Sequence, residues 1–205
     1  MFKKIIVFVV ILFVLTLTIF YNIHSFLSPH KPIKDARILV IDAWLSDREF
    51  NNAVEVFKAG NYSRVIVPGS MMDRSLFFPG MEGSGDVASV ILMYKGIPPD
   101  KITPLLVKHV KKDRTFQAAL TTQKWLKENK ISPSAINLFT SCTHSRRSWM
   151  LYKKAFKNDR VVGIIPAQPV GYDAKKWWKS SNGFRTVLDE AIAYLYARLF
   201  FHPDM

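Results

Sequence analysis

Short apolar runs alternate with segments of helical periodicity along most of this 205-residue chain. Runs typical of buried strands lie at residues 37–44, 64–69, 101–107, 135–141 and 161–167. Segments with apolar residues three or four apart, typical of helices, lie at 47–60, 85–96, 113–129, 146–156 and 185–201. Because a strand followed by a helix repeats five times, the pattern predicts a three-layer α/β/α domain over residues 37–205, with a mainly parallel sheet of about five strands.

The N-terminal part has a different pattern, an uncharged apolar run over residues 5–23. As a helix with about 1.5 Å rise per residue it extends roughly 28 Å, close to the hydrocarbon thickness of a bilayer. Lys3 and Lys4 precede the run, and the next lysine or arginine is Lys31. This asymmetry predicts an N-terminus in the cytoplasm and a domain outside it. We expect an anchor over 1–28, a linker over 29–36, and a single-pass protein of the cytoplasmic (inner) membrane with an extracytoplasmic or periplasmic domain.

Two other interpretations of this run compete with the anchor. A cleaved signal peptide has a shorter apolar region followed by small residues, whereas His24, Ser25, Phe26 and Leu27 follow here. A buried core helix is disfavoured because the run is apolar on all faces. The sequence therefore favours an anchor that is retained.

The chain is strongly basic, with a formal net charge of +13. A basic domain attracts phospholipid head groups, nucleic acid or phosphorylated substrates, although it can also serve solubility alone. No cluster resembles a nucleic-acid-binding arm or motif, so we expect no nucleic-acid partner. Cys142 is the one cysteine, which excludes an intrachain disulfide and a cysteine-rich metal site. No cofactor can be named from the sequence.

The loop after the fourth predicted strand, residues 140–148, carries the densest chemistry. Ligands of parallel α/β sheets bind beyond the carboxyl ends of the strands. Ser141, His144 and Arg147 lie there at a predicted helix start, where free backbone N–H groups and arginine favour an anion such as phosphate. His144 has the pKa range of a general acid or base. The alternative is a polar capping loop without a ligand.

Other strand ends and helix starts add further candidates. Arg114 and Thr115 belong to a basic segment, residues 111–116, at the start of the third helix of the domain, and Ser70 follows the second strand. Asp42 lies at the end of the first strand. A carboxylate there can bind a ligand, act as a base, or cap the turn that follows the strand. Asp86 opens a helix beside Gly83-Ser84-Gly85, which suggests either close approach to a ligand or a flexible loop. We expect no bound metal. The candidate catalytic residues are His144, Asp86 and Asp42, and the candidate anion- or substrate-binding residues are Arg147, Arg114, Thr115, Ser141 and Ser70.

The order and spacing of five segments resemble the SanA/ElyC/YdcF-like family of bacterial proteins. The segments are residues 41–70, 85–102, 113–119, 140–148 and 177–190. By this resemblance Asp86, Thr115, His144 and Arg147 match the acidic residue, threonine, histidine and arginine of the family motifs. The chain departs from the family where Asp42-Ala43-Trp44 replaces a glycine-rich strand end, and where Arg114 and Ala118 replace asparagines.

The resemblance implies a Rossmann-like domain held at a membrane by one helix, with a role in envelope biogenesis. Family members are linked to peptidoglycan and lipid-carrier metabolism, and a cytosolic member to S-adenosylmethionine. The first hypothesis is therefore a protein that binds or processes an anionic, phosphate-bearing cell-wall or lipid-carrier intermediate, such as a polyprenyl phosphate. The alternatives are a non-catalytic binding or scaffold protein for cell-wall assembly, and a nucleotide- or S-adenosylmethionine-binding protein. Whether the protein is an enzyme stays open.

Overall fold

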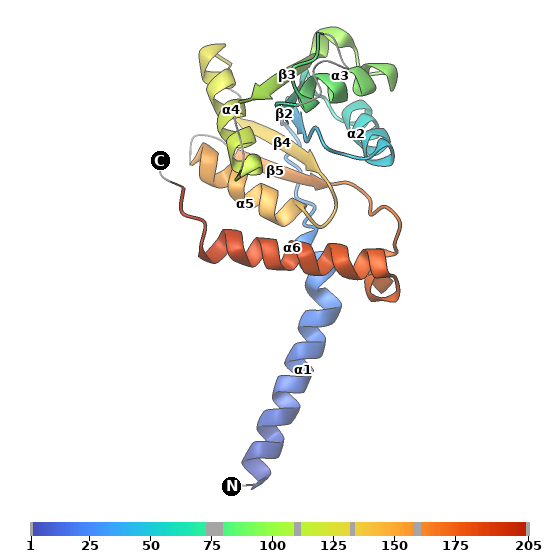
Figure 1. The fold of residues 1–205 in the computed structure, drawn as a ribbon, viewed down its shortest axis with the longest axis vertical. Helices are drawn as coiled ribbons and strands as arrows, with labels where there is room; N and C mark the ends of the chain where they lie inside the picture. The colour runs from blue at the N-terminus through green and yellow to red at the C-terminus, as the bar shows by residue number, and fades with distance from the viewer. Residues whose placement is uncertain (1, 73–79, 109–111, 132–133, 158–160, 204–205) are drawn as a thin grey trace.

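The computed structural model describes residues 2–72, 80–108, 112–131, 134–157 and 161–203. Residues 73–79 of the loop after the second strand, and Lys111 of the basic segment, lie outside this part. All five strands are parallel and their order is β3-β2-β1-β4-β5. This confirms the predicted α/β fold (Figure 1). The strands are β1 (Ile38–Ile41), β2 (Arg64–Ser70), β3 (Ile102–Val107), β4 (Ala135–Thr140) and β5 (Val161–Pro166).

Helices cover the two faces of the sheet in chain order. Helices α2 (Asp47–Ala59) and α3 (Ser84–Tyr94) form one core with the sheet, around Phe50, Leu92 and Val67. Helices α4 (Arg114–Glu128) and α5 (Ser145–Phe156) form the other, around Phe116 and Tyr152. The order in which successive strands are added to the sheet reverses between β1 and β4. A crevice therefore opens between these two strands at the carboxyl edge, where such sheets bind ligands.

Local chemistry explains how these elements begin. The Ser46 hydroxyl caps α2 and the Glu49 carboxylate accepts the Ser46 amide at 2.8 Å, which together form a capping box. Helix α3 starts against β2, because a Cβ on Gly85 would lie 2.6 Å from the Val67 carbonyl oxygen and one on Gly69 would collide with Gly85. The glycines before α3 therefore serve the packing of this helix on the strand.

Two helices outside the three layers complete the fold. Helix α1 (Phe2–Leu27) is long and apolar enough to cross a membrane, and residues 2–19 are all exposed. Its last turns pack against the 3₁₀ helix η3 (Ala174–Lys179) and the closing helix α6 (Ser181–Leu199). Figure 1 shows α6 lying across the base of the domain while α1 projects away from it. A second 3₁₀ helix, η2 (Pro99–Lys101), precedes β3.

The segment over 29–36, expected as a linker, is extended and tied to the sheet. Lys31 forms an antiparallel bridge with Ile164 of β5. The Ile33 amide donates to Asn137 Oδ1 at 2.8 Å, and the Asn137 side-chain amide donates back to the Ile33 carbonyl at 3.0 Å. These bonds fix the path of the chain between α1 and β1. The segment that joins the helix to the domain is therefore bound to the sheet along part of its length.

Candidate functional site

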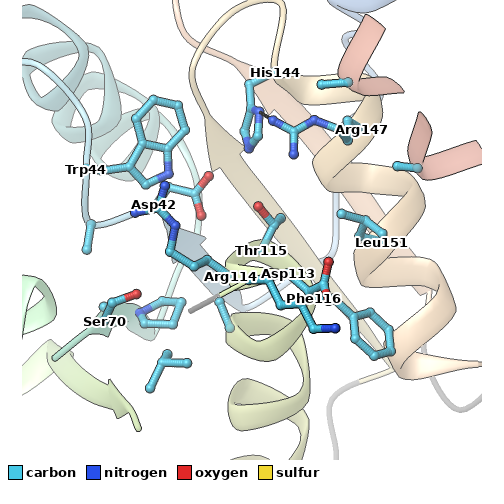
Figure 2. Close-up of a pocket in the computed structure, with 18 of the residues that line it drawn as sticks. Asp42, Trp44, Ser70, Asp113, Arg114, Thr115, Phe116, His144, Arg147 and Leu151 are labelled. Carbon is cyan, nitrogen blue, oxygen red and sulfur yellow. Dashed lines mark hydrogen bonds between the residues drawn. The ribbon is translucent and has the colours of Figure 1, made fainter. Parts of the chain in front are cut away.

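A pocket of about 990 Å³ lies at the carboxyl edge of the sheet, at the crevice between β1 and β4. The ends of β1, β2 and β3, the starts of α4 and α5, and one side of α6 line it. Figure 2 shows that Asp42, Ser70, Arg114, Thr115, His144 and Arg147 surround the same space. The structure thus brings together six of the eight residues that the sequence singled out.

Asp42 is the most enclosed acidic group of the pocket. It follows β1 directly, is only 4% exposed, and accepts a hydrogen bond from the Thr140 hydroxyl at the end of β4. Burial raises the pKa of the Asp42 carboxyl, and the opposing effects of His144, Thr140 and Arg147 do not cancel it. Asp42 therefore keeps its proton to a higher pH than an exposed aspartate and is suited to proton transfer.

Glu190 of α6 binds both functional side chains of the α5 start. Its Oε1 lies 2.9 Å from His144 Nδ1 and 3.0 Å from Arg147 Nη2, and its Oε2 accepts from Arg147 Nε at 3.0 Å. Burial acts to raise the pKa of Glu190, but the hydrogen bonds and charges of His144 and Arg147 outweigh burial and lower the pKa to about 2. Arg147 is therefore already neutralised by a two-point ion pair.

The imidazole of His144 is oriented with one nitrogen free. Nδ1 faces Glu190 and also lies 2.8 Å from Arg147 Nη2, and a proton on Nδ1 is accepted by the ionised Glu190. Nε2 is buried and has no hydrogen-bond partner among the described residues. Figure 2 shows the ring reaching into the pocket beside Trp44, whose indole meets it edge to face at 5.0 Å. A buried nitrogen without a partner is costly, so a ligand or water is expected there.

Arg114 supplies positive charge that the protein itself does not neutralise. The side chain is exposed, reaches into the pocket from the start of α4, and has no acidic or hydrogen-bonding partner within the described part of the chain (Figure 2). Lys112 lines the pocket on the same side. Thr115 and Ser70 add hydroxyl groups. Arg114, with Lys112 beside it, is thus a free cation of the pocket among the described residues, whereas sequence reasoning gave the leading role to Arg147.

Two predicted site residues lie away from the pocket. The Asp86 carboxylate accepts the amides of Glu82 and Gly83, both at 2.9 Å, and so caps the start of α3. Ser141 is absent from the lining, although its carbonyl accepts the Ser145 hydroxyl at 3.1 Å. In the described residues, no group of three histidine, cysteine, aspartate or glutamate side chains is arranged to hold a metal ion.

Sequence reasoning missed Glu190 and the apolar wall of the pocket. Glu190 stands beside Asp189 in the closing helix, and the sequence has no signal that selects one of the two. The wall comes from Leu151 and from α6, through Ile192 and Tyr196.

The fold and the pocket define a class: a Rossmann-like α/β protein with a pocket at the switch in strand order and an apolar N-terminal helix. Comparison with models of known protein families finds none that matches this chain, and comparison with curated proteins finds no matching relative. The function is therefore argued from the pocket.

Proposed function

We propose that this protein is a membrane-anchored member of the SanA/ElyC/YdcF-like family that binds a phosphate-bearing, lipid-linked intermediate of envelope biogenesis. The observation that carries the proposal is one pocket that combines an unneutralised cation with an unpartnered ring nitrogen. Arg114 is the cation and His144 Nε2 is the nitrogen. A phosphate monoester satisfies both, because its charged oxygens accept from the guanidinium and its P–OH group donates to Nε2 of a ring that holds its proton on Nδ1.

The walls of the pocket favour a ligand that also has an apolar part. Ile192, Tyr196 and Phe201 line one side, and Met71 lines another. The volume of about 990 Å³ exceeds what a phosphate needs and lies at the upper end of small-molecule sites. A polyprenyl phosphate, or its sugar conjugate, fits this division into a charged end and an apolar wall. Trp44, 56% exposed at the rim, offers a flat apolar surface to a sugar ring.

The membrane anchor is part of the proposal. The packing of α1 supports a retained helix, because Phe20 contacts Trp177 with ring centroids 4.8 Å apart and Leu27 is 1% exposed in the same cluster. Removal of α1 would expose these apolar surfaces. Lys3 and Lys4 at its start support an N-terminus in the cytoplasm and a domain outside. An anchored domain of this orientation meets lipid-linked intermediates at the outer face of the cytoplasmic membrane.

The chemistry available is general acid–base catalysis. Glu190 holds His144 by Nδ1, so Nε2 can take a proton from an attacking water or return one to a leaving oxygen. Asp42, with its raised pKa, is a second proton carrier. One observation favours the alternative of a non-catalytic binding protein. In the described residues, no serine, threonine or cysteine is bonded to His144 Nε2 as a nucleophile would be.

Binding of a polyprenyl phosphate to the full chain in lipid nanodiscs tests the proposal. Loss of one charge-assisted contact costs roughly 1.5–3 kcal/mol, so Arg114→Ala should weaken binding roughly tenfold to a hundredfold. Arg48→Ala removes the same charge from the exposed surface of α2, outside the pocket, and should leave binding unchanged. Equal binding of the phosphate and the uncharged polyprenol, or equal loss in both variants, would contradict the proposal.

The same preparations separate an enzyme from a binding protein. His144→Gln removes the proton-transfer group but keeps a polar side chain. If the protein is catalytic, this variant binds the lipid phosphate and fails to convert it. If the protein only binds, wild type and variant leave the ligand chemically unchanged, which mass spectrometry of the recovered lipid detects.

A further inference from the structure

Helix α6 carries a long exposed apolar stripe. Successive members are three or four residues apart, and each is exposed by 38% or more. The members are Phe184, Leu188, Ile192, Leu195 and Leu199, called here the outer stripe. Such a spacing places all five on one side of a helix. Contiguous apolar surface of this length on a protein marks a contact with a partner or a membrane.

The outer stripe faces the side into which α1 projects. Val187 and Ala197 of α6 are buried, and Glu190 bonds residues of α5, so the inward side of α6 is fixed. The outer stripe occupies the opposite side. Figure 1 shows α1 extending beyond α6 on the side away from the sheet. The stripe and the free length of α1 therefore face the same surroundings.

The length of α1 sets the depth of α6. Residues 2–19 are all exposed, which at about 1.5 Å per residue is roughly 27 Å, close to the roughly 30 Å of a hydrocarbon core. From Phe20 onward α1 contacts η3 and α6. Once α1 spans a bilayer, α6 is consequently held at the level where the hydrocarbon ends.

Aromatic and basic side chains, which are typical of membrane–water interfaces, lie around the level at which α1 would leave the hydrocarbon core. Tyr21 and Trp178 pack together with ring centroids 5.2 Å apart. Exposed basic residues follow on η3 and α6, namely Lys175, Lys176, Lys179, Arg185 and Arg198. Tryptophan and tyrosine concentrate at bilayer interfaces, and lysine and arginine reach from there to anionic head groups.

We infer that α6 lies flat on the surface of the bilayer that α1 spans, with its outer stripe in the boundary between head groups and acyl chains. Interfacial helices of this kind insert roughly 5–10 Å. Ile192 belongs both to the outer stripe and to the pocket wall, and Tyr196 is an exposed neighbour in that wall. Resting on the proposed function, the inference means that the pocket opens at the membrane surface, where the head group of a lipid phosphate lies.

Quenching by brominated lipids tests this on the full chain in nanodiscs. A bimane dye is attached at Leu195→Cys in the outer stripe, at Leu12→Cys in α1, or at Lys124→Cys on the far helix α4. Lys124 has a side chain 75% exposed and serves as the water-facing control. Cys142 is buried, so the unsubstituted protein gives the labelling background. Lipids brominated near the head-group end of the acyl chain should quench the dye at Leu195 several-fold more than the dye at Lys124.

Each outcome of this experiment decides a separate point. Quenching at Leu12 without quenching at Leu195 keeps the anchor and overturns the contact of α6 with the membrane. Absence of quenching at Leu12, which is measured with lipids brominated near the methyl end of the acyl chain, overturns the anchor and with it the inference. A blue-shifted dye at Leu195 that brominated lipids do not quench means that protein, such as a second copy of the chain, covers the stripe, which also overturns it. Unchanged far-ultraviolet circular dichroism of each variant verifies the fold.

Discussion

Charge pairing at single residues determines which side chains remain available to a ligand. Arg147 was expected to hold the anion, but its Nε and Nη2 groups already donate to the two carboxylate oxygens of Glu190. Arg114 stays free within the described part of the chain. Replacing Arg147 would also leave Glu190 with an uncompensated charge, so such a variant loses stability together with any binding. Arg114 is therefore the better position for testing anion binding.

Glu190→Gln should lower stability at neutral pH by roughly 2–3 kcal/mol, because the carboxylate holds Arg147 and His144 together. The pKa of Glu190 is lowered to about 2 from an ordinary 4.5. Its contribution is therefore fully present above pH 4.5 and is lost as the pH falls toward 2. Thermal unfolding of the full chain in detergent should show a melting temperature lower by roughly 5–10 °C at pH 7, and a smaller difference near pH 3.

Asp189→Asn is the matched control for this prediction. Asp189 is the neighbour of Glu190 on α6, but it is exposed and has no hydrogen-bond or ion-pair partner in the described residues. Its substitution should leave the melting temperature nearly unchanged. A Glu190→Gln melting curve that matches wild type at pH 7 would show that the pair is not stabilising.

The residues of the site were predictable to the extent that strand order predicts position. Asp42, His144 and Arg147 were found because parallel strands bring their carboxyl ends to one edge. Glu190 was not, because α6 follows the last strand and no pairing rule says how it folds back over α5. Asp86 lies outside the pocket lining, and the sequence could not show this, since an acidic residue at a helix start suits a ligand site and a helix cap equally well.

At the scale of elements, the capping of α3 accounts for Asp86. We predict that Asp86→Ala destabilises the protein by roughly 0.5–2 kcal/mol, because two backbone amides lose their acceptor. Asp86→Asn keeps an acceptor oxygen and should restore most of the stability. Both variants should bind a polyprenyl phosphate as wild type does. Loss of ligand binding in a stable Asp86→Asn protein would instead support the direct role that the sequence suggested.

The elements themselves were predictable because buried strands and amphipathic helices differ in period. All five strands and the five helices that follow them occur in the predicted order. Boundaries depend on local bonds that periodicity does not reveal. The closing helix begins at Ser181, before the predicted residue 185, because the Ser180 hydroxyl accepts the Gly183 amide at 3.0 Å and caps it. The hydrogen bonds that tie residues 29–36 to β4 and β5 correspond to no hydrophobic or polar pattern in the sequence, so they could not be predicted.

At the scale of the whole molecule, the topology is the next prediction. Lys3 and Lys4 precede α1, so alkaline phosphatase fused to the C-terminus should be active, because this enzyme works only outside the cytoplasm. A cytoplasmic reporter fused at the same place should be silent. The opposite pattern would place the pocket in the cytoplasm, and the proposed outer-surface ligand would then be wrong.

The central claim is that a lipid phosphate occupies the pocket against His144. The most direct measurement follows the ¹⁵N resonance of His144 Nε2 in the full chain in nanodiscs, assigned among the five histidines with His144→Gln. Because Nε2 has no partner in the described residues, saturation with a polyprenyl phosphate should shift this resonance, whereas the uncharged polyprenol should not. Arg114→Ala should require roughly tenfold to a hundredfold more ligand for the same shift. Saturable binding of the phosphate with an unmoved His144 resonance would contradict the account.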